Sequence, residues 1–175
     1  RFKNFKAWQD SGQIRLAPLT VLFGANSAGK TSIPQLLLLL KQTAESPDRQ
    51  RALQFGDSRT IIDLGTYDDA VHRHDIAQPL AIDFTWRPAE TLQIADPVSS
   101  AKYQGDAIRF AVSVSADKRH QPVVDDLEYT VLHEGVEQLR VGMKRQEGAT
   151  KFDLTASQYK LVRHTGRAWP LPQPV

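Results

Sequence analysis

The sequence LTVLFGANSAGKT, residues 19–31, gives the strongest indication of the fold and its ligand. It opens with a short apolar run that ends in glycine, as a buried strand does where it enters a phosphate-binding loop. The loop matches the pattern G-x-x-x-x-G-K-[ST] at every fixed position, and its residues are Gly24, Ala25, Asn26, Ser27, Ala28, Gly29, Lys30 and Thr31. The two glycines allow the backbone to turn so that successive N–H groups face phosphate oxygens. The stretch therefore predicts a phosphate-binding loop (P-loop) for a nucleoside triphosphate.

A helix is expected to follow, from about residue 29 to residue 44. Its N-terminus would present unpaired N–H donors and the positive end of its dipole to the phosphates. We expect the Lys30 ammonium to reach the β- and γ-phosphates and the Thr31 hydroxyl to bind Mg²⁺, with Ser32 in the same nucleotide-binding set. Leucines at 36–40 cover every face, which predicts burial on most sides. Pro34 is expected to distort the helix without ending it.

The rest of the chain reads mainly as strands. Residues 1–6 and 13–17 are expected to form a hairpin, 49–55 a short helix, and 61–65 a short strand and turn. Further strands are predicted at 80–86, 107–115, 127–133, 138–143, 151–155 and 159–164, and a mobile loop at 92–105. The predicted fold class is α+β: a P-loop strand and helix packed on a mixed or antiparallel sheet, with a β-rich C-terminal half.

Length and composition set the limits of this interpretation. The 175 residues fit one domain, which we divide into 1–45 (hairpin, P-loop and helix), 60–168 (β-rich) and a Pro-rich exit at 169–175. The absence of cysteine excludes disulfides, thiolate metal sites and a catalytic Cys. A formal net charge of +2 gives no argument for a nucleic-acid surface. No apolar run is long enough to span a bilayer, and we expect a cytoplasmic location.

Two classes of P-loop protein are excluded by the residues present. GTPases read guanine with an N-K-x-D element, and neither Asn4 nor Asn26, the only asparagines, precedes a lysine. A small-molecule kinase would need helices that alternate with parallel strands after the P-loop, whereas this chain continues as strands at hairpin spacing. What is left is a P-loop joined to an antiparallel sheet.

The first 45 residues resemble the N-terminal half of an ABC-type ATPase head. The motif KNFK at 3–6, followed by the loop GANSAGKT, is similar to the SMC/RecF/OLD branch, where N-F-K/R precedes G-x-N-x-x-G-K-S/T. Residues 63–75, DLGTYDDAVHRHD, further resemble bacterial AAA family and ABC-like ATPases related to the OLD group. The resemblance implies ATP as the nucleotide, Asn26 as the family's P-loop asparagine, and Lys6 as a basic residue that approaches the phosphates. The alternative for Lys6 is an exposed lysine at a strand edge.

Groups that this family needs for hydrolysis are missing from the sequence. The second half of an ABC-type head supplies a signature motif, a Walker B strand that ends in Asp-Glu, and a switch histidine. Here no run of four apolar residues precedes Asp-Glu; the nearest stretches are LAID at 80–83 and VVDD at 123–126. We therefore assign no catalytic residue and expect ATP binding without efficient hydrolysis.

We expect the chain to be the N-terminal lobe of a longer ATPase. The partners implied by the resemblance are the C-terminal lobe, a second head in a homodimer, and DNA or a nuclease or effector. The parent protein would act in DNA-related or phage-defence processes.

Two other interpretations are left open by the residues. The chain is either a self-contained P-loop NTPase of another class, with Asp83 as its magnesium carboxylate, or a β-rich interaction module at 107–168 in which ATP is structural. His72, His74 and Asp75 give a weak zinc signal, and solvated loop residues are the better interpretation. Residues 68–69 fit a helix N-terminus better than a nucleotide contact, and 118–120 are expected at a charged hairpin tip.

Overall fold

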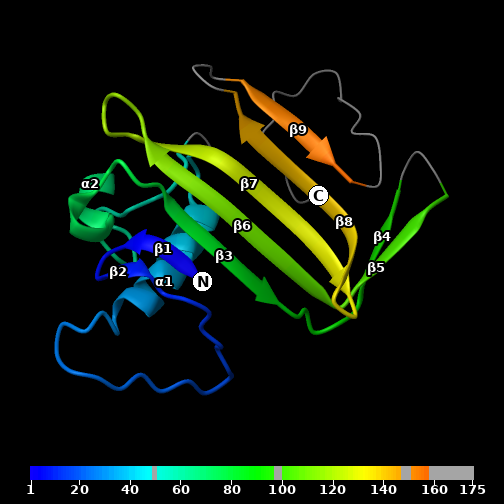
Figure 1. The fold of residues 1–175 in the computed structure, drawn as a ribbon, viewed down its shortest axis with the longest axis horizontal. Helices are drawn as coiled ribbons and strands as arrows, with labels where there is room; N and C mark the ends of the chain where they lie inside the picture. The colour runs from blue at the N-terminus through cyan, green and yellow to red at the C-terminus, as the bar shows by residue number, and fades with distance from the viewer. Residues whose placement is uncertain (49–50, 97–99, 147–150, 158–175) are drawn as a thin grey trace.

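The protein is a strand-rich α+β fold (Figure 1). The computed structural model describes residues 1–48, 51–96, 100–146 and 151–157. The strands are β1 (Phe2–Phe5), β2 (Trp8–Asp10), β3 (Leu80–Trp86), β4 (Leu92–Ala95), β5 (Lys102–Gly105), β6 (Ala107–Ala116), β7 (Pro122–His133), β8 (Val136–Arg145) and β9 (Phe152–Ala156). The helical segments are α1 (Ser32–Glu45), α2 (Tyr67–Ala70) and the 3₁₀ turn η1 (His72–His74).

In the described ranges, seven strands form one antiparallel sheet in the order β2-β1-β3-β6-β7-β8-β9. The strands β4 and β5 form a separate hairpin. The alternating residues at 107–115 place one face of the strand in the core, as expected, because Val112 and Val114 are buried there. The turn between β7 and β8 is Glu134-Gly135, with both residues at positive φ, as a tight hairpin of that sequence requires. The antiparallel β-rich half of the prediction is therefore confirmed.

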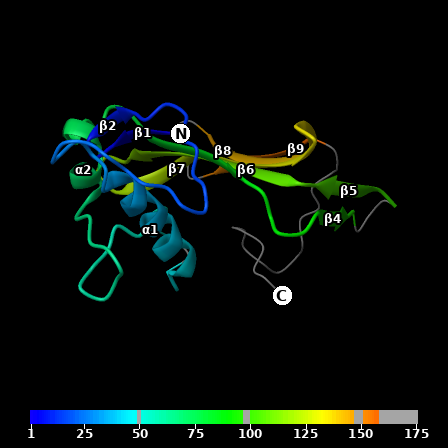
Figure 2. The same ribbon diagram turned by 90° about the horizontal axis from the view of Figure 1, so that it is seen from below.

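The helix α1 covers one face of the sheet at the end where β1 and β2 lie, whereas β4 and β5 project from the opposite end (Figure 2). Ile33, Leu36 and Leu39 are buried in the core that α1 shares with β1, β3 and β6. Leu37 is exposed, whereas Leu36 and Leu39 are buried and Leu38 and Leu40 are half-buried, so the predicted burial fails on the face that carries Leu37. Pro34 lies within the first turn, where a backbone N–H has no partner inside the helix, and it does not interrupt α1.

The segment before the P-loop differs from the prediction. Residues 19–23 form no strand, and Leu19 and Phe23 are 83% and 90% exposed. In Figure 1 this segment belongs to the long blue connection from β2 to α1. The expected hairpin partner at 13–17 is also absent, because the chain already reverses at Lys6-Ala7 and β2 takes that place beside β1. A strand needs a neighbour for its backbone groups, and the described chain offers none to residues 19–23.

The structure differs from three other predictions, and two predicted segments lie outside the described residues. Residues 51–55 are not helical, although Leu53 and Phe55 are buried in the core. Residues 61–65 form no strand, and the loop expected at 92–105 contains the β4–β5 hairpin. The strand expected at 159–164 and the exit at 169–175 lie outside the described residues. Within the described ranges, no helix combines the length and the apolar content that crossing a membrane requires.

Candidate functional site

The P-loop leads directly into α1, whose N-cap residue is Thr31. Ser27 and Gly29 have φ values of 64° and 83°, so the backbone turns through the left-handed region twice within the loop. In the described part of the chain, no group accepts a hydrogen bond from the backbone N–H of Asn26, Ser27, Gly29, Lys30 or Thr31. A run of free donors at the start of a helix is the arrangement that binds anionic oxygens.

The Lys30 side chain folds back across its own loop. Its ammonium donates hydrogen bonds to the carbonyl oxygens of Gly24, at 2.7 Å, and Ala25, at 2.6 Å. These are neutral acceptors, and hydrogen bonds between an ammonium and an anionic phosphate oxygen are stronger. The Lys30 ammonium therefore lies against its own loop, where a phosphate would bind.

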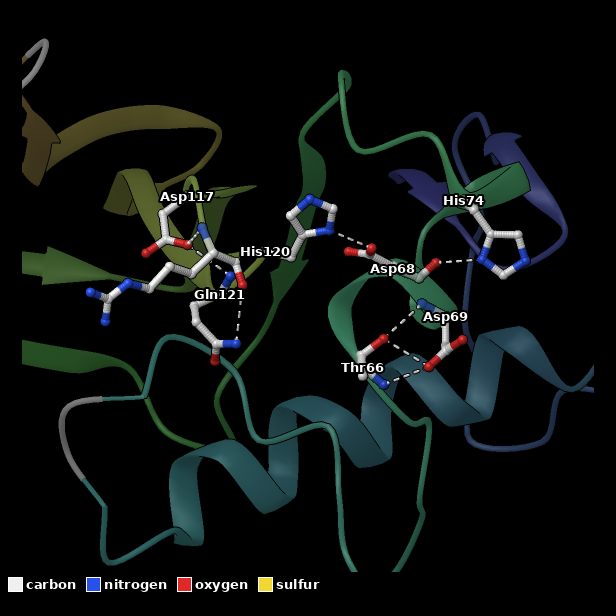
Figure 3. A network of polar contacts seen from close by, with 8 residues as sticks. Thr66, Asp68, Asp69, His74, Asp117, His120 and Gln121 are labelled. Atoms are coloured by element: carbon white, nitrogen blue, oxygen red, sulfur yellow. Dashed lines mark hydrogen bonds and ion pairs between the residues drawn. The ribbon is translucent and has the colours of Figure 1, made fainter.

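A second segment, residues 64–75, faces the P-loop and contains α2 and η1. Thr66 and Asp69 form a capping box: the Thr66 N–H and hydroxyl donate to the Asp69 carboxylate at 2.9 and 2.7 Å, and the Asp69 N–H donates back to the hydroxyl at 3.3 Å. These hydrogen bonds lower the pKa of the Asp69 carboxyl, so the group stays ionised. This network is drawn in Figure 3.

Asn4 holds the end of the second segment against β1. Its side chain is 5% exposed and donates to the carbonyl oxygens of Asp75, at 2.9 Å, and Gln78, at 2.6 Å. Its own Oδ1 accepts from the His72 N–H at 3.1 Å. Asn4 has φ of +53°, a conformation that asparagine tolerates better than most residues. The asparagine of the motif at 3–6 therefore ties the second segment to β1.

Lys6 contacts the same segment with both its backbone and its side chain. The Lys6 N–H donates to the Ala70 carbonyl at 2.8 Å, and the Lys6 carbonyl lies 2.9 Å from Nδ1 of His72. The ammonium is 3.1 Å from the Asp69 carbonyl and 3.5 Å from that of Leu64. The side chain therefore lies between the P-loop and the second segment, and its hydrogen bonds go to the second segment.

The P-loop and the second segment enclose an open cavity of about 560 Å³. One wall consists of residues from the loop and the start of α1, namely Asn26, Ser27, Gly29, Lys30, Thr31 and Ser32. The other wall includes Lys6, Asp69, Val71, Arg73 and His74. Gly24, Ala25 and Ala28 do not line the cavity, although two of them accept from Lys30. Among the described residues, three with cationic side chains, Lys6, Lys30 and Arg73, line this cavity, and one with a carboxylate, Asp69, lines it with them.

Several of these positions were not singled out as nucleotide contacts from the sequence. Ala7, Gln35, Val71, Arg73 and His74 line the cavity. For Val71, Arg73 and His74, one indication was present in the sequence, which is the family resemblance over residues 63–75. Their approach to the P-loop depends on the hydrogen bonds of Asn4 and Lys6, which a linear motif does not reveal.

The histidines at 72 and 74 have structural hydrogen bonds. Nδ1 of His74 lies 2.8 Å from the Asp68 carbonyl, as Figure 3 shows, and His72 contacts Lys6 as described above. The described residues contain no group of three or more side chains placed to hold a metal ion. His74 and Asp75 are exposed, as the solvated-loop interpretation expects, and both histidine rings in addition fasten the turn.

The charged hairpin tip between β6 and β7 reaches α2. Nδ1 of His120 lies 2.6 Å from Oδ2 of Asp68, and the tip itself is closed by Asp117, which accepts from the Gln121 N–H at 2.9 Å (Figure 3). The N–H groups of Gln121 and Arg119 lower the pKa of the Asp117 carboxyl. Asp68 and His120 therefore connect the large sheet to the second wall of the cavity.

Asp83, the magnesium carboxylate of the alternative interpretation, lies elsewhere. It forms a two-point ion pair with Arg109, at 2.6 and 3.0 Å, on neighbouring strands β3 and β6. It lines a different cavity, together with Arg1 and Lys3, and does not line the P-loop cavity.

Comparisons with protein-family models, with curated proteins and with solved structures found no match for this chain. The function of the site is therefore argued from its residues and geometry.

Proposed function

We propose that this chain is an ATP- and Mg²⁺-binding lobe of an ABC-type ATPase of the SMC/RecF/OLD branch. The observation that carries the proposal is the complete P-loop motif at the start of α1, in which the N–H groups of Asn26, Ser27, Gly29, Lys30 and Thr31 have no acceptor in the described structure. A fourteen-residue helix supplies a dipole whose positive end adds to this site. The strand-rich antiparallel region beside the P-loop is compatible with the same class.

The residues present suit a magnesium triphosphate. The loop N–H groups and the Lys30 ammonium would hold phosphate oxygens, and the Thr31 hydroxyl would be a ligand of the metal, which neutralises charge on the phosphates when bound. The cavity is open and large enough to admit a nucleotide, at about 560 Å³. Ser32 and Asn26 line it as well, in agreement with the proposed binding set.

Hydrolysis would need groups that the sequence lacks. Phosphoryl transfer depends on positioning and on charge stabilisation, including a residue that orients the attacking water. In the described structure, the carboxylate that lines the cavity is that of Asp69, and its Oδ2 is bonded to Thr66. We therefore propose that turnover requires the C-terminal lobe and a second head, and that the parent acts in DNA-related or phage-defence processes.

The exposed apolar run before the P-loop supports a lobe that binds another lobe. Four of the five residues at 19–23 are apolar, as in a buried strand, yet all four are exposed, namely Leu19, Val21, Leu22 and Phe23. Contiguous exposed apolar residues mark surfaces that a partner buries. In this proposal, strands of the C-terminal lobe pair with residues 19–23 and complete the strand–P-loop–helix unit.

ATP binding and steady-state hydrolysis, measured for this chain and for Lys30→Ala, test the proposal. We expect Mg²⁺-dependent ATP binding that Lys30→Ala weakens by about tenfold or more, with negligible turnover. Thr31→Ala should reduce the effect of Mg²⁺ on affinity while leaving metal-free binding nearly unchanged.

Each other outcome has a distinct meaning. Robust turnover that depends on Lys30 would reject the half-head interpretation in favour of a self-contained NTPase. Absence of binding at high ATP concentration would reject the nucleotide site and favour an interaction module.

A further inference from the structure

We propose that Arg73 is a second phosphate-binding cation of the P-loop site, and that Lys6 positions it. This inference rests on the proposed ATP-binding function. The family resemblance assigns the phosphate contact to Lys6, whereas the structure places the Lys6 ammonium on backbone carbonyls. The division of roles between the two cations is thus the new element.

The two side chains differ in what they already contact. The Lys6 ammonium is hydrogen-bonded to the carbonyls of Asp69 and Leu64. Arg73 lines the cavity opposite the P-loop, and its guanidinium has no hydrogen bond or ion pair with any described residue. Of the three cationic residues that line the cavity, Arg73 is therefore the one whose side chain has no partner among the described residues. Its planar fork matches two phosphate oxygens at once.

The backbone at Arg73 is held in an unfavourable conformation. Arg73 and His74 have φ values of 55° and 58°, and neither is a glycine. Such a pair persists only where surrounding contacts impose it. Those contacts are the carboxamide of Asn4 on the Asp75 carbonyl, at 2.9 Å, and the ring of His74 on the Asp68 carbonyl, at 2.8 Å. The strain is thus maintained at the point where the turn faces the P-loop.

Lys6 is a further support of this turn. Its N–H and carbonyl hold Ala70 and His72, the residues just before Arg73, and its ammonium holds the carbonyl of Asp69. Loss of the Lys6 side chain would release one attachment of the second wall. The effect on a ligand would then pass through the placement of Arg73.

Binding of two probes tests the role of Arg73. ATP with Mg²⁺ and inorganic tripolyphosphate are titrated into the wild-type chain, Arg73→Gln and the control Arg87→Gln, whose arginine is exposed beyond the far end of β3. We expect Arg73→Gln to weaken both probes by about tenfold, the loss of one charge-assisted contact, and Arg87→Gln to leave them unchanged. Weaker ATP binding with unchanged tripolyphosphate binding would overturn the proposal, because Arg73 would then contact base or ribose.

A double-mutant cycle tests the role of Lys6. If Lys6 acts through Arg73, Lys6→Met will weaken ATP binding in the wild-type background but hardly at all in Arg73→Gln. Losses that add would show that Lys6 contacts the phosphates itself and would overturn its positioning role. Circular dichroism and thermal unfolding of each variant identify any that fail to fold, and Lys6→Arg replaces Lys6→Met in that case.

The two proposals fail in different ways. If the wild-type chain binds ATP, Lys30→Ala weakens that binding and Arg73→Gln matches the wild type, only the Arg73 inference is rejected. If the wild-type chain binds neither probe, the nucleotide site and the Arg73 inference are both rejected.

Discussion

The indole Nε1 of Trp8 donates a hydrogen bond to the carbonyl oxygen of Gly29 at 3.0 Å. This contact joins β2 to the P-loop immediately before α1. A Cβ atom at Gly29 would lie 2.6 Å from that same Nε1 and 2.8 Å from Cβ of Ala7. The second glycine of the loop is therefore required for two reasons, its left-handed backbone and the close approach of β2.

Gly29→Ala is expected to impair both folding and ligand binding. The left-handed backbone costs about 1–2 kcal/mol for a residue with a Cβ, and the clash with Trp8 adds to it. Gly135→Ala is the matched control, since Gly135 has a φ of 81° with open space around the Cβ position. Urea unfolding should show a loss in both variants and a larger one in Gly29→Ala. ATP titration should show weaker binding for Gly29→Ala alone; equal binding by both would refute the steric argument.

Asn4→Ala is expected to loosen the second wall of the cavity and to destabilise the fold. It removes the donor of two part-buried hydrogen bonds and the acceptor of the His72 N–H, which costs about 2–4 kcal/mol in the free energy of unfolding. Asn4→Gly separates the two contributions of Asn4, because glycine also lacks the side chain but accepts positive φ without strain. Hydrogen exchange should show faster exchange in residues 64–78 of both variants. Unchanged exchange there would contradict the role of Asn4 as a clamp.

Several strands of the sheet were predictable from the sequence, whereas the surroundings of the P-loop motif were not. Alternation placed β3 at its observed bounds and located β6 to within one residue, because one face of each is buried by α1. The run at 19–23 has the same strand character, but a strand forms only where a neighbour satisfies its backbone groups. Local pattern describes what a segment favours and does not reveal whether a partner strand is present.

Of the two walls of the candidate cavity, the sequence singled out residues of one, the P-loop wall. The residues of the P-loop follow from a contiguous motif whose geometry is local. The second wall comes from residues about forty positions later, and its approach depends on single side chains such as Asn4 and Lys6. Long-range hydrogen bonds of this kind have no periodicity in sequence. The motif at 3–6 was noticed through its resemblance to a family, whereas its function as a clamp is visible only in three dimensions.

Tyr67→Phe is expected to weaken the junction of α2 with the sheet. The Tyr67 hydroxyl donates to the Val114 carbonyl at 2.8 Å and accepts from the Leu80 N–H at 3.3 Å, and the side chain is 1% exposed. Burial raises the pKa of this phenol, which keeps it protonated as a donor. Its removal leaves two buried backbone groups unpaired, at a cost of about 1–3 kcal/mol.

Tyr129→Phe is the control for this change. Tyr129 is half-exposed, and its hydroxyl has no hydrogen-bond partner among the described residues. Urea unfolding should therefore show a change within about 0.5 kcal/mol for Tyr129→Phe. Equal losses in the two variants would show that the Tyr67 hydroxyl has no special role.

The stability of the sheet is expected to fall in acid through the pair of Asp83 and Arg109. The hydrogen bonds of Arg109 lower the pKa of the Asp83 carboxyl in the folded chain. A carboxyl with a lowered folded pKa contributes stability above its unfolded pKa, near ~3.9, and loses it as the pH falls through the folded value. Asp83→Asn should therefore be less stable than the wild type at neutral pH, with a difference that shrinks below about pH 4. Arg109→Gln should behave in the same way, because Asp83 then loses the partner that lowers its pKa. Urea midpoints measured from neutral to acid pH check this, and a difference between Asp83→Asn and the wild type that stays constant across the series would exclude the ion pair as its cause.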